Sequence, residues 1–107
     1  MVETKITSRL SIGSWITLGH PAIAEIMAAA GFDWLAVDLE HSVITIREAE
    51  ELIRIIELKG VTPFVRLSSN NPEQIKRVMD SGAHGVIVPM VNSAEAARKA
   101  VAAAKYP

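Results

Sequence analysis

The sequence predicts an α/β domain whose strands form a parallel sheet. Four short apolar runs alternate with four segments in which apolar residues recur every three or four positions, the spacing of a helix that packs on one side. The apolar runs, of which residues 34–37 are the clearest, do not alternate with polar residues, which is typical of strands buried on both faces of a parallel sheet. Two architectures fit this order: a doubly wound sheet, and half of a (β/α)₈ barrel.

The first two strand-and-helix units are bounded by local signals. We expect a strand over residues 12–18, after which Pro21 suits the first turn of a helix. The second strand is expected over residues 33–38. Thr45 and Glu48 then have the spacing of a capping box, which predicts the start of a strong helix.

The last two units carry similar signals. A strand is expected over residues 62–67, and Asn71, followed by proline, predicts the N-cap of the third helix. The fourth strand is expected over residues 85–88. Asn92, with Glu95 three residues later, is expected to cap the fourth helix.

The composition excludes several classes of protein. Lys and Arg number 11 against 12 Asp and Glu, a net charge of −1, so no basic stripe indicates nucleic acid. The absence of cysteine excludes disulfides and thiolate metal sites. No apolar run reaches the roughly 18 residues that span a membrane, and residues 1–10 lack the apolar segment of a secretory signal. We therefore expect a cytoplasmic protein.

The length bears on the choice of architecture. A complete (β/α)₈ barrel takes about 250 residues, so residues 1–107 correspond to one domain of nearly half that size. An isolated four-stranded sheet would leave its first and fourth strands as open edges, which natural proteins avoid. We expect the chain to be the N-terminal half of a longer barrel.

Ionisable side chains cluster at the predicted carboxyl ends of the strands, the edge at which parallel α/β folds carry their functional groups. The second strand ends in Asp38, Glu40 and His41, the third ends in Arg66, and Trp15 lies near the end of the first. These side chains are therefore expected to converge on one rim.

Each of these residues has a structural interpretation beside a functional one. Arg66 is either half of an ion pair with Asp38 or Glu40, which burial of its charge would require, or a planar fork for a carboxylate or enolate oxygen. His41 is either a turn residue or, beside carboxylates, a general base. Asp80, at the end of the third helix, is by default a solvated helix residue.

Other chemistries find no support in these residues. The sequence has no glycine-rich nucleotide loop. No lysine stands at a strand end, so a Schiff-base mechanism is not indicated. No three-ligand metal set is visible, and for His20 and His84 we expect ordinary loop positions.

Three segments of the sequence resemble a known family. "AGFDWLAVDLEHS", "TPFVRLSSNNPEQIKRVMDSGAHGVIVPMV" and "AAAKYP" are similar to the HpcH/HpaI aldolases, and the resemblance runs from about residue 12 to the end. These are class II, metal-dependent pyruvate aldolases with a TIM-barrel fold, such as 4-hydroxy-2-oxoheptanedioate aldolase and 2-dehydro-3-deoxyglucarate aldolase. The resemblance implies a (βα)₄ N-terminal half of a TIM barrel.

The resemblance also implies roles for the rim residues. His41 would be the catalytic base that takes a proton from the pyruvate methyl group, and Asp80 the aspartate that pairs with it. Arg66 would hold the oxygens of pyruvate and stabilise the enolate. Trp15 would line the substrate pocket, and two acids would lie near metal-bound water without being direct ligands: Asp38 and Glu40.

A cofactor and partners follow from the same resemblance. It implies a divalent metal (Mg, Mn or Co) whose ligands, a Glu and an Asp, lie on later strands beyond Pro107. It also implies a small-molecule 2-oxo acid and an aldehyde as substrates, and a homo-oligomer, commonly a hexamer.

The expected activity is the reversible cleavage of a 4-hydroxy-2-oxo acid to pyruvate and an aldehyde through a metal-bound enolate. The alternatives are a related lyase that acts on an acyl-CoA or an oxaloacetate-type substrate, and a non-catalytic half-barrel. We expect these 107 residues alone to be inactive, because half of the site wall and the metal ligands are missing from them.

Overall fold

The computed structural model describes residues 10–106, which form a parallel sheet and a layer of helices. Strands and helices alternate, as predicted. The order along the chain is β1 (Gly13–Ile16), α2 (Pro21–Ala29), β2 (Trp34–Asp38), α3 (Ile46–Leu58), β3 (Thr62–Arg66), α4 (Pro72–Asp80), β4 (Gly85–Ile87) and α5 (Ala94–Lys105). None of the helices in this part of the chain is long and apolar enough to cross a membrane.

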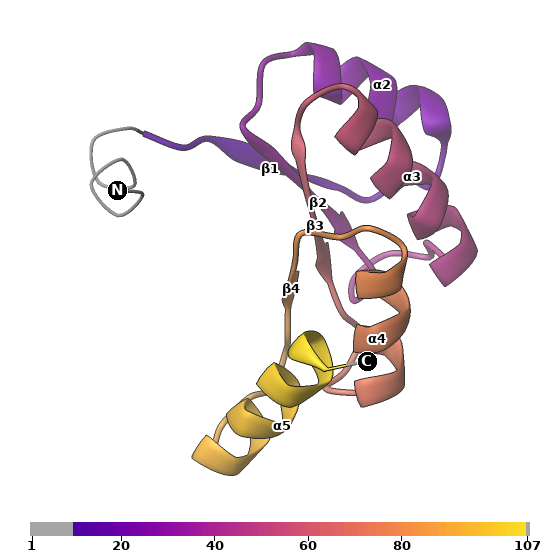
Figure 1. Ribbon diagram of the computed structural model, residues 1–107. Coiled ribbons are helices and arrows are strands. Elements are labelled where there is room, and N and C mark those ends of the chain that lie inside the picture. Colours follow the sequence, from indigo (N-terminus) through magenta and orange to yellow (C-terminus); the bar gives the residue numbers. More distant parts are fainter. Residues whose placement is uncertain (1–9, 107) are drawn as a thin grey trace.

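Strand order decides between the two architectures. The strands lie side by side in chain order, β1-β2-β3-β4, with no reversal. The helices α2, α3 and α4 follow one another along one side of the sheet (Figure 1), and α5 packs against α4. A doubly wound sheet reverses its strand order and carries helices on both faces. The arrangement is instead that of four consecutive units of a (β/α)₈ barrel, with the helices on its outer side.

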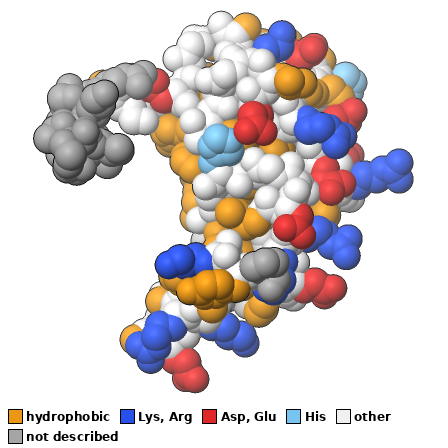
Figure 2. Space-filling model, viewed as in Figure 1, with side chains coloured by type: hydrophobic (Ala, Val, Ile, Leu, Met, Phe, Trp, Pro, Cys, Tyr) orange, Lys and Arg blue, Asp and Glu red, His pale blue; other side chains and the backbone are white. Residues whose placement is uncertain are grey.

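The core lies between the sheet and the helices. On this side of the sheet Leu35, Val37 and Val65 are fully buried, and they belong to one cluster with the apolar face of α3. The side chains of that face which reach the core are Ala49, Leu52, Ile53 and Ile56. Charged side chains of both signs gather over the outer surface of the helices (Figure 2).

The opposite face of the sheet is the concave side of the partial barrel, and it is only partly buried. Trp15 and Ile87 on this face are 40% and 39% exposed. The prediction that the strands are buried on both faces is therefore correct for the helix side and only partly correct for the concave face, where Ala36 is buried. Covering the concave face takes the remaining strands of a barrel, which these residues do not supply.

Most of the local signals were read correctly. In the capping box, the Glu48 N–H donates to Thr45 Oγ1 at 3.1 Å and the Thr45 N–H donates to Glu48 Oε1 at 2.9 Å. Asn71 Oδ1 caps α4, as predicted. The predicted cap of α5 was wrong: Ser93, not Asn92, holds that position, because its Oγ accepts the Ala96 N–H at 3.1 Å.

The first strand is shorter than the predicted residues 12–18. Only Gly13–Ile16 has partners in β2, beginning with Gly13 opposite Trp34. Gly13 is needed here because a Cβ atom at this position would lie 1.9 Å from the Trp34 ring. The indole of Trp34 fills the place that a side chain at residue 13 would take.

Candidate active site

The centre of the site is a pair of opposite charges at the carboxyl ends of two strands. Asp38 ends β2, Arg66 ends β3, and the two residues are direct partners in the register of the sheet. The Arg66 guanidinium donates from Nε to Asp38 Oδ1 at 3.1 Å and from Nη2 to Asp38 Oδ2 at 2.7 Å. Such a two-point bond holds one edge of the guanidinium against the carboxylate.

Asp38 also organises the turn that follows it. Its side chain is buried, and its Oδ1 accepts the backbone N–H groups of Glu40 at 2.8 Å and His41 at 3.1 Å. Together with the two bonds from Arg66, four donors occupy this carboxylate, which is about its full capacity. Asp38 therefore holds the turn and the guanidinium in place at once.

These contacts fix the charges of the pair. The hydrogen bond from Arg66 lowers the pKa of Asp38 from its usual 3.8 to about 2, against burial, which raises it; the N–H groups of His41 and Glu40 add to the lowering. The bond to Asp38 raises the pKa of Arg66 above its usual value. The ion-pair interpretation of Arg66 is thus correct. The guanidinium side chain is still 26% exposed, so a second partner can reach it.

Trp15, from β1, lies under the same guanidinium. The central carbon of the Arg66 guanidinium is 4.3 Å from the centroid of the Trp15 ring, well within the range of a cation–π contact. Asp38 therefore holds the edge of the guanidinium while Trp15 holds its face.

Glu40 stands between the arginine and the histidine. Its Oε1 lies 3.6 Å from Arg66 Nε and 3.6 Å from His41 Nε2. The Glu40 side chain is 23% exposed and that of His41 is 68% exposed, so the imidazole lies at the open rim of the sheet. Every rim residue predicted from β1, β2 and β3 is thus brought to one place.

Asp80 is not part of this group within the chain. It is the exposed last residue of α4, and it lies in a hollow with Lys105 and Tyr106. The chain enters β4 shortly after Asp80, at the amino-terminal edge of the sheet. His41 lies at the carboxyl-terminal edge, so the structure does not bring the two side chains together.

The two other histidines have structural contacts. His20 is the N-cap of α2, and its Nδ1 accepts the Ala22 N–H at 3.0 Å. His84 Nε2 lies 2.9 Å from Glu57 Oε2, which ties the start of β4 to α3.

Two features of the site were missed in the sequence. The Ser42 hydroxyl donates to the carbonyl oxygen of Asp38 and accepts the Ile44 N–H at 3.1 Å, which closes the turn. Serine hydroxyls often accept the backbone N–H of the second residue after them in turns, so the contact of Ser42 with Ile44 could have been predicted from the sequence. The stacking of Trp15 on Arg66 had no comparable signal, because it joins two strands that are not neighbours.

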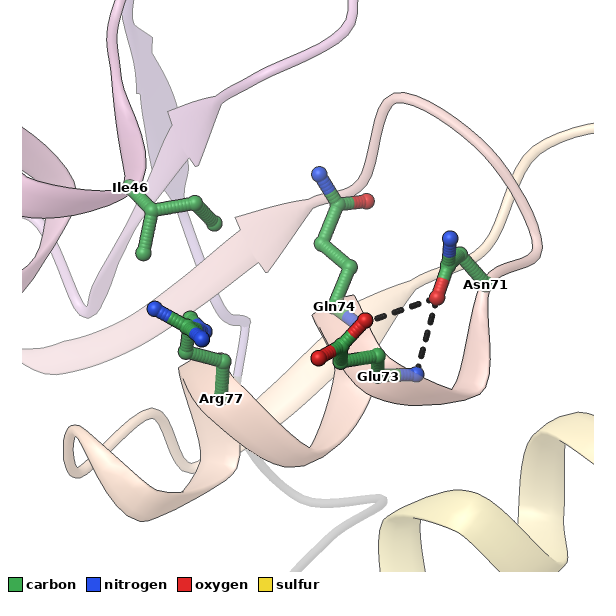
Figure 3. Close-up of a pocket in the computed structure, with 5 residues that line it drawn as sticks. All are labelled: Ile46, Asn71, Glu73, Gln74 and Arg77. Carbon is green, nitrogen blue, oxygen red and sulfur yellow. Dashed lines mark hydrogen bonds between the residues drawn. The ribbon is translucent and has the colours of Figure 1, made fainter.

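A separate hollow of about 250 Å³ lies in the helix layer, lined by Ile46 of α3 and by residues at the start of α4 (Figure 3). The side chains of Asn71 and Gln74 in its lining are already engaged. Asn71 Oδ1 accepts the N–H groups of Glu73 and Gln74, and the Gln74 side chain bonds with Ser68. The hollow is a gap around a helix cap and contains none of the predicted site residues.

Comparison with known proteins places this arrangement in a family. A family model described as HpcH/HpaI aldolase/citrate lyase matches residues 11–107. The chain belongs to this family. The match includes every residue of the rim cluster, from Trp15 to Arg66.

Relatives of this HpcH/HpaI chain are longer proteins. It is 43% identical over 96 residues to a 2-dehydro-3,6-dideoxy-6-sulfogluconate aldolase of Pseudomonas putida, a match that covers 90% of this chain and 38% of the relative. It is 41% identical over 105 residues to a 4-hydroxy-2-oxo-heptane-1,7-dioate aldolase of Salmonella paratyphi C, covering 98% and 40%. The chain thus spans about two fifths of the length of these relatives.

Solved structures of the family agree with the fold. The HpcH/HpaI aldolase from Desulfitobacterium hafniense superposes with a TM-score of 0.85 at 36% identity, covering 99% of this chain and 42% of that one. A citrate synthase variant superposes with a TM-score of 0.82 at 29% identity, covering 99% and 45%. The predicted (βα)₄ fold is confirmed.

The divalent metal that the resemblance to HpcH/HpaI aldolases implies has no complete set of ligands in the described part of the chain. Between residues 10 and 106, no three His, Cys, Asp or Glu side chains form a group that could hold a metal ion. Asp38 is saturated by its four donors, which leaves Glu40 as the acid of the rim with capacity for another partner.

Proposed function

We propose that the protein containing this chain is a 2-oxo acid aldolase. It would reversibly cleave a 4-hydroxy-2-oxo acid to pyruvate and an aldehyde. The observation that carries the proposal is the Asp38–Arg66 pair at the strand ends, with His41 beside it, in a chain of the HpcH/HpaI family. Relatives named as aldolases support it.

Arg66 is proposed to hold the oxygens of pyruvate and to stabilise the enolate. Cleavage of the carbon–carbon bond leaves negative charge on the oxygen at C2 of the product. A guanidinium that is already fixed by Asp38 and Trp15 needs no rearrangement when this charge appears, which is the condition for effective electrostatic catalysis. Its pKa is raised, so it stays charged throughout.

His41 is proposed to move the proton at the methyl carbon of pyruvate. Its imidazole stands at the open rim, where a substrate can reach it, and its backbone is tied to Asp38. Glu40, whose Oε1 lies 3.6 Å from Nε2, is placed to orient the ring. Proton transfer by a placed histidine is typical of general base catalysis.

A divalent ion is proposed as the cofactor, with its ligands on strands beyond Pro107. The residues described here do not fit as its ligands, since no group of three is present among them. Such an ion would polarise the carbonyl of the 2-oxo acid. Asp38 and Glu40 would lie near its bound water, as the family resemblance implies.

Asp80 is proposed to act only in an oligomer. A dyad of Asp80 with His41 is implied by the resemblance, but the two residues lie at opposite edges of the sheet in one chain. A second copy whose α4 approaches the rim would allow the dyad to form although the two residues are far apart within one chain. We therefore propose a homo-oligomer in the cytoplasm in which Asp80 of one copy faces His41 of the next.

The test is an assay of the full-length protein for pyruvate, coupled to lactate dehydrogenase, with added Mg²⁺, Mn²⁺ or Co²⁺. His41→Ala and Arg66→Ala are each expected to lower kcat by about 10²-fold or more, the typical scale for a base or an oxyanion donor. His84→Ala is the matched control, because His84 is paired with Glu57 away from the rim. Rates like those of the unchanged protein in both site variants would refute the roles.

A citrate-synthase-like activity is the second candidate. The superposition on a citrate synthase variant favours it, because condensing an acyl-CoA with oxaloacetate also passes through an enolate. Release of free thiol from acetyl-CoA with oxaloacetate, without pyruvate formation from hydroxy-oxo acids, would select this alternative. If the downstream sequence lacks a Glu and an Asp at later strand ends and both assays fail, the non-catalytic half-barrel remains.

A further inference from the structure

We propose that Trp15 is a positioning residue of this site, whose indole face sets the orientation of the Arg66 guanidinium toward the reacting oxygen. The inference rests on the proposed function. It differs from the family expectation for Trp15, which is a place in the wall of the substrate pocket. A positioning residue acts through Arg66, whereas a wall residue acts on the substrate directly.

The geometry of the Asp38–Arg66 pair leaves one motion to be controlled. Two parallel hydrogen bonds, at 3.1 and 2.7 Å, hold one edge of the planar guanidinium. The guanidinium can still rotate about the axis that runs along this edge. Tilting would move the far edge, which carries the remaining N–H groups, away from the direction of a bound oxygen.

Trp15 stops this tilt. Its ring lies under the guanidinium with 4.3 Å between the ring centroid and the central carbon, so the cation sits over the face of the indole. Asp38 and Trp15 thus restrain the group from the edge and from the face. The edge opposite Asp38 is left for a ligand.

The ring of Trp15 is itself held in place by other aromatic rings. It meets Trp34 edge to face, with centroids 6.3 Å apart and planes at 85°, and Trp34 leans on Phe64 at 6.0 Å. Gly13 makes room for this row by leaving the space of its missing side chain to Trp34. The row crosses the sheet from β3 through β2 to β1, and it gives Trp15 a fixed position although 40% of the residue is exposed.

A double-mutant cycle on the full-length enzyme separates the two roles. Trp15→Leu is expected to lower kcat/KM about 3- to 30-fold, the range of a cation–π contact, with most of the loss in kcat. In an Arg66→Ala background the same change is expected to cost less than about twofold, because the residue through which Trp15 acts is gone. Trp15→Phe keeps a smaller π face, so its kcat/KM is expected to lie between those of the unchanged enzyme and Trp15→Leu.

Phe32→Leu is the control. It removes an aromatic ring that packs against the core and is not part of the row that holds Trp15, so kcat/KM is expected to stay within about threefold in both backgrounds. If Trp15→Leu does not fold, Trp15→Phe carries the same cycle with a smaller expected loss. Additive losses, or a loss confined to KM, would overturn the inference and leave the aldolase proposal standing. No activity in the unchanged enzyme would overturn both.

Discussion

Asp38 and Arg66 face each other across two neighbouring strands, and their side chains form two hydrogen bonds of 2.7 and 3.1 Å. This pair thus connects the carboxyl ends of β2 and β3, the turn after β2 and the guanidinium at the rim. The charge of Asp38 is held by Arg66 and by two backbone N–H groups, so the order of the rim depends on the ionisation of this one carboxyl.

The first prediction concerns acid. The pKa of Asp38 is about 2 in the folded protein against 3.8 ordinarily, so ionised Asp38 favours the folded state above pH 4 and this stabilisation is lost as the pH falls toward 2. The difference corresponds to about 2 kcal/mol. The free energy of unfolding in urea, measured at pH 5 and pH 2, should therefore fall by about 2 kcal/mol more in the unchanged protein than in Asp38→Asn.

The comparison with Asp38→Asn isolates this carboxyl, because all other acids titrate in both proteins. At pH 5 the variant is expected to be less stable by about 3 kcal/mol, since it leaves the guanidinium without its charged partner. A gap between the two proteins that does not change with pH would show that Asp38 is not held ionised by Arg66.

Much of this rim was predictable from the sequence because parallel α/β folds collect the ends of their strands at one edge. Asp38, Glu40, His41 and Arg66 were recognised as polar residues at the end of apolar runs, and the register of β2 and β3 then brings the first and last of them face to face. Periodicity alone did not decide between barrel and doubly wound sheet, because both repeat the same unit; strand order decided it.

The position of Asp80 could not be predicted from local pattern. Its sequence distance from His41 says nothing about which edge of the sheet it occupies; that depends on the direction of α4, which returns the chain to the amino-terminal edge. The stacking of Trp15 on Arg66 was hidden for a related reason, since β2 separates the strands that carry them. Both cases are decided by tertiary geometry.

The cap of α5 provides a prediction at single-residue resolution. Ser93 Oγ accepts the Ala96 N–H, while Asn92 precedes the cap. Ser93→Ala should therefore lower the free energy of unfolding by about 1 kcal/mol, the usual cost of a lost N-cap. Asn92→Ala should change it by less than about 0.5 kcal/mol, as surface substitutions do. A larger loss of unfolding free energy in Asn92→Ala than in Ser93→Ala would show that Asn92 is the N-cap.

Gly13 and Gly31 should respond to alanine for different reasons. At Gly13 the added methyl would lie 1.9 Å from the Trp34 ring, so the aromatic row must move, and we expect a loss of about 2–3 kcal/mol in the free energy of unfolding. Gly31 has open space but a φ of +98°, which an L side chain adopts at a cost of about 1–2 kcal/mol.

Fluorescence separates the two glycine variants where stability does not. Gly13→Ala should shift the tryptophan emission, because it displaces Trp34, whereas Gly31→Ala should leave the emission unchanged. An unshifted spectrum in Gly13→Ala, together with full stability, would contradict the close packing of the glycine against the indole.

The last prediction tests whether Asp80 and His41 meet between copies. Asp80→Asn and His41→Ala are each expected to be nearly inactive alone in the full-length protein. When the two variants are co-expressed and assemble together, some interfaces combine an intact Asp80 from one copy with an intact His41 from the other. Random assembly gives such sites at about a quarter of all positions, so activity should return to about a quarter of normal.

The control for this experiment is co-expression of Arg66→Ala with His41→Ala. Both residues belong to the rim of a single chain, joined through Glu40 by contacts of 3.6 Å, so no mixture of these two variants contains an intact site. Activity should stay at the level of the separate variants. Recovery in this control would mean that the rim itself is shared between copies, while no recovery with Asp80→Asn would remove Asp80 from the catalytic group, because the chain alone holds it at the opposite edge of the sheet.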